Sequence, residues 1–267
     1  VFGGSIYVQD MRPQGMVHGR VVRPPRAGST LESFDEAGAK KIPGVIAVVR
    51  DGSFLGVVAE REEQAIKARE ALIKSSKWKL GPELPDPNNL YAHLKSLPSV
   101  DQVISNKQGP VLAFGKTLEA TYTKPYMSHG SIGPSASLAE FRDGTMTVWT
   151  HSQGVFPLRG ELVKALKLPA AQIRCVHVEG SGCYGHNGAD DVALDAALLA
   201  KGVPGRPVKL QWMRDDEFKW EPYGPAMAMQ AKATLDAVRE EGLKVVPRCS
   251  FIAAYIQRHP EYQDLLA

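Results

Sequence analysis

Short apolar or alternating runs recur along this chain and predict a series of strands. Successive side chains of a strand point to opposite faces, so alternation, or a brief apolar run between turn residues, indicates a strand. The expected strands cover residues 17–23, 45–49, 54–59, 118–122, 136–141, 146–150, 173–178 and 207–212. Apolar residues at helical spacing predict helices over residues 62–75, 90–97, 156–166 and 189–200. Strands and helices intermix along the chain, so the expected fold class is α+β.

Turn residues and prolines divide these elements into segments. Asp143-Gly144 lies between two alternating runs and predicts a tight hairpin. Residues 83–114 contain several prolines and are expected to form a linker or an extended surface excursion. We therefore expect one α/β unit over residues 1–82 and a second over residues 115–231.

The most informative stretch covers residues 173–200, where a strand is followed by a glycine-rich loop and a helix. Glycine lets a ligand approach the backbone closely, and the start of a helix adds N–H donors that favour an anion. Gly180, Gly182 and Gly185 fit the G-x-G-x-x-G pattern of dinucleotide-binding proteins. That pattern also needs an acidic residue at the end of the next strand, and residues 207–212 contain none. A nucleotide-binding oxidoreductase and a tight turn without a ligand both stay open.

Composition and charge exclude several classes of protein. The chain has 267 residues, of which 43% are hydrophobic, so it can bury a sizeable core. A net charge of +3 without a basic run interleaved with aromatic residues gives no reason to expect nucleic acid as a partner. No apolar run is long enough to span a membrane. Three cysteines without a C-x-x-C pair argue against a disulfide framework, a zinc ribbon or an iron–sulfur cluster in this chain.

Several ordered motifs resemble one known family. They are Tyr122-x-x-Pro125, His129, Gly133-Pro134, residues 148–153 (VWTHSQ), residues 166–169 (LKLP), residues 180–185 (GSGCYG) and residues 205–217. This order resembles the molybdopterin-binding large subunits of the xanthine dehydrogenase/aldehyde oxidase family, especially those of isoquinoline 1-oxidoreductase and nicotinate dehydrogenase. Residues 16–25 and 42–45 resemble the α/β hammerhead domain of that family, and the likeness extends to about residue 230.

This resemblance implies a molybdenum hydroxylase that inserts water-derived oxygen into an aldehyde or an N-heteroaromatic substrate. The implied cofactor is molybdenum held by molybdopterin, in its plain form or as the cytosine dinucleotide. A two-iron two-sulfur subunit is the implied partner, and a cytochrome or a flavin accepts the electrons. The residues implied to bind the cofactor are Gln153, Gly154, Gly180, Gly182, Cys183, Tyr184 and Gly185. An amide such as that of Gln153 can donate to an oxo group, and backbone N–H groups suit a pterin.

Some positions depart from the family pattern. Cys183 stands where much of the family has Phe, and we expect a small side chain packed beneath the cofactor, with metal ligation as the alternative. His186 and Asn187 either orient a ligand or, for Asn187, start the following helix. The family's general-base glutamate lies beyond the matching part. No catalytic or metal-ligating residue is therefore assigned, and the chain is expected to be a fragment that is inactive alone.

The last segment, residues 232–267, resembles a different family. It is similar to the C-terminal end of a small GNAT-type acetyltransferase, without the acetyl-CoA phosphate loop of such enzymes. Its pattern predicts helices over residues 234–241 and 249–259 and a strand over residues 243–246. We interpret it as a foreign tail without acetyltransferase activity, which leaves a non-catalytic truncated remnant as a further alternative for the whole chain.

Overall fold

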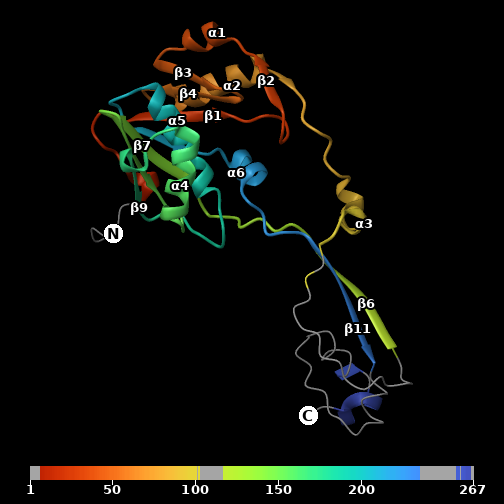
Figure 1. Ribbon diagram of the computed structural model, residues 1–267. Coiled ribbons are helices and arrows are strands. Elements are labelled where there is room, and N and C mark those ends of the chain that lie inside the picture. Colours follow the sequence, from red (N-terminus) through yellow and green to blue (C-terminus); the bar gives the residue numbers. More distant parts are fainter. Residues whose placement is uncertain (1–6, 101, 103–116, 235–256, 259, 266–267) are drawn as a thin grey trace. The chain divides into compact units, whose positions relative to one another are not determined.

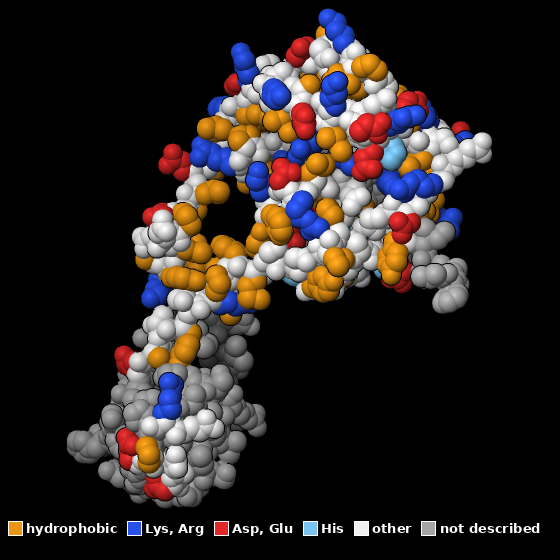
Figure 2. All heavy atoms as spheres, turned by 180° about the vertical axis from the view of Figure 1, so that it is seen from behind, with side chains coloured by type: hydrophobic (Ala, Val, Ile, Leu, Met, Phe, Trp, Pro, Cys, Tyr) orange, Lys and Arg blue, Asp and Glu red, His pale blue; other side chains and the backbone are white. Residues whose placement is uncertain are grey.

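The structure is a computed structural model that describes residues 7–100, 102, 117–234, 257–258 and 260–265. By its internal contacts the chain forms two compact units (Figure 1). Unit 1 comprises Val1–Leu84 with Met127–Gly224, and unit 2 comprises Pro85–Tyr126 with Pro225–Ala267. Basic and acidic side chains intermix on the face of unit 1 that Figure 2 shows, in keeping with the small net charge of +3. No helix in the described part is both long enough and apolar enough to cross a lipid bilayer.

A seven-stranded mixed sheet forms the centre of unit 1. Its spatial order is β3 (Val45–Asp51), β4 (Phe54–Ala59), β1 (Val17–Val22), β10 (Val208–Gln211), β7 (Ala136–Arg142), β8 (Thr145–Thr150) and β9 (Ile173–His177). The pairs β1–β10 and β8–β9 are parallel, and the other neighbours are antiparallel. A separate two-stranded sheet pairs β2 (Thr30–Ser33) with β5 (Lys77–Lys79). All the strands predicted in unit 1 are present, with ends that differ by one or two residues.

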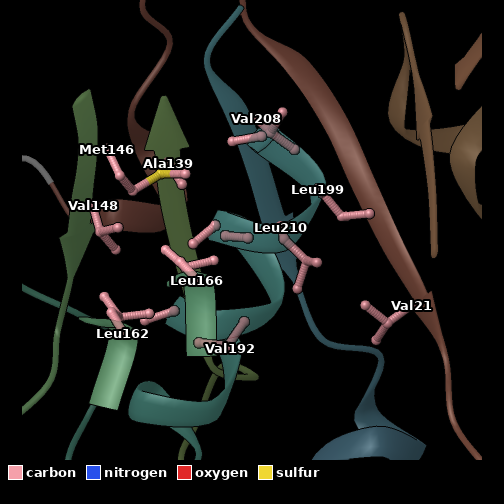
Figure 3. Packing of buried hydrophobic residues seen from close by; sticks show 14 of the residues in the cluster. Val21, Ala139, Met146, Val148, Leu162, Leu166, Val192, Leu199, Val208 and Leu210 are labelled. Carbon is pink, nitrogen blue, oxygen red and sulfur yellow. The ribbon is translucent and has the colours of Figure 1, made fainter. Parts of the chain in front are cut away.

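Helices cover both faces of the large sheet. α5 (Ala189–Gly202) and α4 (Val155–Leu166) pack on one face, where Val192 and Leu199 lie in one core cluster with Val208 and Leu210 (Figure 3). α2 (Glu62–Ser75) packs against β1 and β4 in a second cluster. Successive side chains of β1 point to opposite faces of the sheet. Val21 therefore belongs to the first cluster and its neighbour Val22 to the second. The short helices η1 (Val8–Asp10), α1 (Glu36–Lys40) and η3 (Ala170–Gln172) also lie in this part.

The sequence predicted a boundary between two units at residue 82. In the structure, strands from both sides of that residue belong to one sheet. β1 comes from the first predicted unit and β10 from the second, and Val17 pairs with Val208 in a parallel ladder. The two segments therefore share one sheet and one core cluster. The reason is that neither segment buries both faces of its own strands alone.

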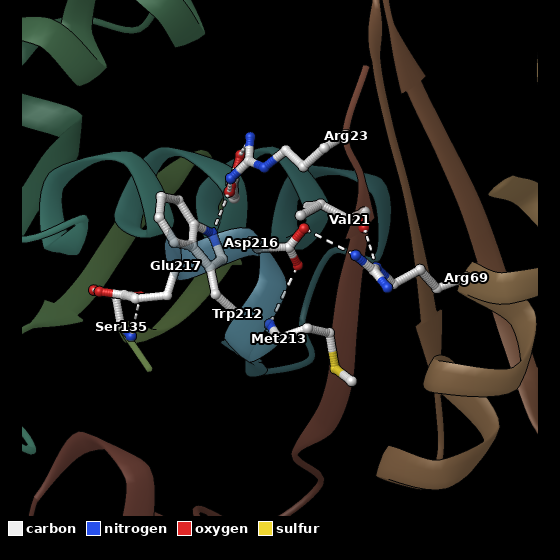
Figure 4. Close-up of polar contacts among 9 residues, drawn as sticks. Val21, Arg23, Arg69, Ser135, Trp212, Met213, Asp216 and Glu217 are labelled. Carbon is white, nitrogen blue, oxygen red and sulfur yellow. Dashed lines mark hydrogen bonds and ion pairs between the residues drawn. The ribbon is translucent and has the colours of Figure 1, made fainter. Parts of the chain in front are cut away.

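Two buried ion pairs also join these segments (Figure 4). Arg69 of α2 donates to Asp216 at 2.8 Å and to the carbonyl of Val21 at 2.8 Å. Asp216 belongs to α6 (Arg214–Trp220), a short helix that the hydrophobic pattern did not indicate. Arg23 donates to Asp195 of α5, which also accepts from Nε1 of Trp212 at 2.9 Å. Buried charges persist only when they are paired, so these contacts depend on both segments.

The predicted hairpin is confirmed. Asp143 and Gly144 both have positive φ, at 49° and 76°, and they connect β7 to β8. Two consecutive left-handed residues form the turn whose twist matches antiparallel strands, which is why Asp-Gly is favoured there.

Unit 2 contains η2 (Pro87–Asn89), α3 (Leu90–Ser96), β6 (Thr117–Lys124), β11 (Met227–Thr234) and η4 (Pro260–Leu265). β6 and β11 form an antiparallel ladder from Met227–Lys124 to Thr234–Thr117. The helix expected within the proline-rich stretch is confirmed as α3. Thr234, expected to begin a helix, instead ends β11, and most of the remaining expectations for the tail lie outside the described residues.

Candidate functional site

The loops that carry the predicted cofactor-binding residues leave the same edge of the sheet. β8 and β9 are parallel, with Thr150 opposite His177, and the N–H of Val178 donates to the carbonyl of Thr150 at 3.0 Å. Gln153 and Gly180 each lie three residues beyond that last pair. The carboxyl ends of parallel strands meet at one edge, and open α/β sheets bind ligands there.

The glycine loop, residues 178–188, lies against two histidine side chains. A Cβ added at Gly180 would lie 2.4 Å from Cγ of His151, and one added at Gly185 would lie 2.4 Å from Cδ2 of His129. Gly182 and Gly185 also have φ values of +119° and +139°, which L-residues rarely adopt. The glycines are therefore required by packing and backbone conformation in this structure, before any ligand is considered.

Asn187 fixes the end of the loop at the start of α5. Its Oδ1 accepts from the N–H of Ala189 at 3.1 Å, and its Nδ2 donates to the carbonyl of Gly182 at 3.2 Å. The side chain is buried. Gly188 is the N-cap residue of α5, so Asn187 reaches the first helical N–H from the position before the cap, and its role toward a ligand stays a prediction.

The start of α5 does not suit an anion, although the sequence predicted one there. Asp190 and Asp191 stand in the first turn, where their carboxylates already interact with the positive end of the helix dipole. Nε2 of His186 lies 3.8 Å from Oδ2 of Asp190. A phosphate at this position would face two carboxylates, so we expect a neutral polar group to be preferred.

A cavity of about 240 Å³ lies between the two loops. It is lined by Gln153, Gly154, Pro157, His186, Asn187, Ala189 and Asp190. Two of the predicted residues, Gln153 and Gly154, therefore share this cavity with the end of the glycine loop. The other predicted residues, Gly180, Gly182, Cys183, Tyr184 and Gly185, are not part of this lining. Pro157 and Asp190 were not predicted to line a site. Each lies in the first turn of a helix, where the helix itself accounts for the residue type.

Cys183 and Tyr184 lie on the exposed side of the loop. Tyr184 is 60% exposed, and Sγ of Cys183 donates to the carbonyl of Gly185 at 2.8 Å. Packing of Cys183 beneath a cofactor stays a prediction. The described residues include no group of three or more histidine, cysteine, aspartate or glutamate side chains placed to hold a metal ion.

His151 is buried and neutral. Its Nε2 accepts from the N–H of Ala136 at 3.3 Å, so the ring proton is on Nδ1, which faces Gly180. Burial, with a smaller contribution from the nearby His177, lowers the pKa of His151 to about 4. Protonation of Nε2 would also remove the acceptor of the Ala136 N–H.

This arrangement predicts a pH-dependent stability. Between pH 6.5 and 4 the unfolded chain binds the His151 proton and the folded chain does not, so stability falls as the pH is lowered through this range. At pH 4.5 the loss from this group is about 2 kcal/mol relative to pH 7. Urea unfolding at both values should show that loss in the parent chain and in the exposed-site control His186→Gln, but not in His151→Gln. Equal losses in His151→Gln and the parent chain would contradict the assignment.

The topology excludes a dinucleotide-binding unit. In that unit the strand before the glycine loop and the strand after the helix are parallel neighbours. Here β9 is at the edge of the sheet beside β8, whereas β10 lies between β1 and β7. The G-x-G-x-x-G spacing that begins at Gly180 therefore occurs in a sheet whose strand order differs from that of dinucleotide-binding units.

Comparison with family models shows which family the chain resembles. The model described as molybdopterin cofactor-binding domain matches residues 102–242, just over half of the chain. A second model, GCN5-related N-acetyl-transferase, matches residues 224–265 and overlaps the first. The resemblances found at both ends of the sequence are therefore confirmed.

Individual proteins agree with this match. The chain is 41% identical over 246 residues to a nicotinate dehydrogenase subunit of Pseudomonas putida, covering 88% of this chain and 21% of that protein. It is 28% identical over 224 residues to the aldehyde oxidoreductase molybdenum-binding subunit PaoC of Escherichia coli, covering 74% and 30%. The solved quinoline 2-oxidoreductase of Pseudomonas putida 86 has the same fold, with a TM-score of 0.66 at 17% identity over 85% of this chain and 35% of that one. The chain thus spans between a fifth and about a third of the length of these proteins.

Proposed function

We propose that this chain, which belongs to the molybdopterin-binding large subunits of the xanthine dehydrogenase/aldehyde oxidoreductase family, holds part of a molybdenum–pterin cofactor where β8 and β9 end. The observation that carries the proposal is the cavity in which Gln153 and Gly154 meet the end of the glycine loop. Its volume of about 240 Å³ is below the range of about 300–1,000 Å³ typical of complete ligand sites. The cavity therefore suits one portion of a large cofactor.

The chemistry of the site fits the pterin better than its phosphate. Gln153 is exposed at the cavity and carries a neutral amide, which both donates and accepts hydrogen bonds. Asp190 lines the same cavity and disfavours a second negative charge. We infer that the neutral, hydrogen-bonding edge of the pterin faces Gln153.

Two buried histidine nitrogen atoms lie close to the loop but outside the cavity lining. Nδ1 of His129 and Nδ1 of His151 are buried and have no hydrogen-bond partner within the described part of the chain. Both imidazoles contact glycines of the loop. Buried polar atoms without partners commonly mark a place where water or a ligand completes the structure.

When bound, the cofactor supplies the molybdenum centre for oxidative hydroxylation. This chain's own residues would position it: Asn187 and the two histidines hold the glycine loop, and Gln153 would donate to an acceptor atom of the cofactor. The relatives' names support an aldehyde or an N-heteroaromatic compound as the substrate class. We also propose that residues 1–82 are the hammerhead-like segment of the family, with strands that share the large sheet with residues 136–211. We further propose a plain or cytosine-dinucleotide cofactor, and a partner chain with two-iron two-sulfur clusters that passes electrons to a cytochrome or a flavin.

Residues 232–267 are outside this proposed function. The acetyltransferase-like match begins at residue 224, yet the ladder between β6 and β11 continues through Thr234. We propose no acetyltransferase activity for this segment.

Binding of a pterin probe tests the proposal. Titration of the 267-residue chain with 6-hydroxymethylpterin, followed by pterin fluorescence, should show saturable binding. Gln153→Ala removes one hydrogen-bonding amide and should weaken binding about fivefold to tenfold, as expected for a single hydrogen bond. The matched control Gln14→Ala changes an exposed glutamine elsewhere and should leave the affinity unchanged. Absence of binding, or equal weakening by both substitutions, would refute the placement of the pterin at Gln153.

A further inference from the structure

A second cavity in unit 1 shares no residue with the glycine-loop cavity. Its volume is about 540 Å³, within the range of about 300–1,000 Å³ typical of small-molecule sites. Most of its lining comes from α2, from α6 and from the loop that follows β1. We propose that this cavity binds a small aromatic monocarboxylate.

The charges of the lining favour an anion. Four cationic side chains line the cavity, and two of them are already paired: Arg23 with the buried Asp195, and Arg69 with Asp216. Arg26 and Lys219 form no ion pair within the described part of the chain. Nε of Arg26 is also buried without a hydrogen-bond partner there. Arg26 as a whole is only partly buried and lines the cavity, so a bound carboxylate would pair with its guanidinium.

The same lining limits the ligand to one negative charge. Asp215 and Asp216 face the cavity, and Oδ2 of Asp215 lies 3.6 Å from Arg69. When Asp195 is counted with the lining, a single positive charge remains in excess. A dianion or a phosphate would therefore meet uncompensated carboxylates, whereas a neutral ligand would leave Arg26 unpaired.

Apolar side chains supply a surface for a flat ring. Trp220, Ile73, Pro24 and Pro25 line the cavity beside the cations. Ile73 is 43% exposed, so part of its side chain is open to a ligand. Arg23 lies 5.8 Å from the ring centroid of Trp220 and 4.7 Å from that of Trp212, and Figure 4 shows Arg23 and Trp212 beside each other. An aromatic body packed on these groups, with its carboxylate toward Arg26, would bury apolar area and pair the excess charge.

The experiment compares benzoate with benzamide, which has almost the same shape and no charge. The full chain is labelled with 5-fluorotryptophan, and its four tryptophan resonances are assigned from single Trp→Phe variants. Benzoate should shift the ¹⁹F resonance of Trp220 saturably, with a dissociation constant on the order of 1 mM for so small a ligand. Benzamide should bind at least about tenfold more weakly, because the charge-assisted hydrogen bond is lost.

Substitutions at the two unpaired cations complete the test. Arg26→Gln and Lys219→Gln should each weaken benzoate binding about fivefold or more, whereas Lys67→Gln, an exposed change on α2, should not. Lys219 is exposed, so its variant should fold even if the Arg26 variant does not. Equal binding of benzoate and benzamide, an unshifted Trp220 resonance, or unchanged binding in both cation variants would overturn the proposal. None of these outcomes depends on the pterin site, because the two cavities have no residue in common.

Discussion

Replacement of Asp195 by alanine is expected to lower the free energy of unfolding by about 3–5 kcal/mol, because it leaves a largely buried cation without its partner. Asp195 accepts hydrogen bonds from Arg23 and from Nε1 of Trp212, and it is only 4% exposed. Its removal also leaves the Trp212 donor unsatisfied. Arg23 follows β1 and Asp195 lies on α5, so this ion pair joins two segments that are distant in sequence. Loss of the ion pair should therefore weaken the packing between these segments.

Urea unfolding of the parent chain and three variants measures this effect. Asp195→Asn keeps an acceptor for Trp212 but not the charge, so its loss should be smaller than that of Asp195→Ala. Asp191→Ala changes an exposed carboxylate one turn away and should cost less than about 1 kcal/mol, the usual contribution of a charge at a helix start. If Asp191→Ala were as damaging as Asp195→Ala, the ion pair would not be the cause.

Replacement of Gly180 by alanine is expected to damage both the stability and the pterin site. The added Cβ would lie 2.4 Å from Cγ and 2.5 Å from Cβ of His151, whose ring is buried and has little room to move. Overpacking of this kind costs about 1–3 kcal/mol. The loop must shift to relieve the contact, so binding of 6-hydroxymethylpterin should weaken about tenfold or more, a change of about 1.4 kcal/mol.

Gly160→Ala is the matched control for this substitution. Gly160 lies within α4, and a Cβ there would have no atom within 4 Å. Alanine is the better helix former, so this variant should be more stable than the parent chain by up to about 1 kcal/mol, with unchanged pterin binding. Comparable damage from both substitutions would show that contact with His151 does not explain the glycine at position 180.

Local patterns were sufficient to predict most elements of unit 1. The Asp143-Gly144 turn, the helix at Glu62–Ser75 and the strand before the glycine loop each depend on interactions between residues close in sequence. Alternation and helical spacing report such interactions directly. The position of Gln153 beside the loop was also predictable, once β8 and β9 were taken as parallel neighbours.

The remaining features depend on contacts between distant residues. Nothing local indicates that Val17 pairs with Val208, or that Arg69 reaches Asp216. α6 is short, and its acidic residues are held by such contacts instead of by an apolar face. The carboxylates at the start of α5 were visible in the sequence, but their effect on an anionic ligand became clear only when Asp190 was found to line the cavity.

The central proposal is one cofactor-binding surface formed by Gln153, Gly154 and the end of the glycine loop. The most direct test of that surface is amide NMR of the ¹⁵N-labelled chain during titration with 6-hydroxymethylpterin. We predict saturable shifts concentrated at residues 153–154 and 178–189, with little change in β3, β4 or α2. Shifts confined to other parts of the chain, or none at saturating pterin, would contradict the proposed site.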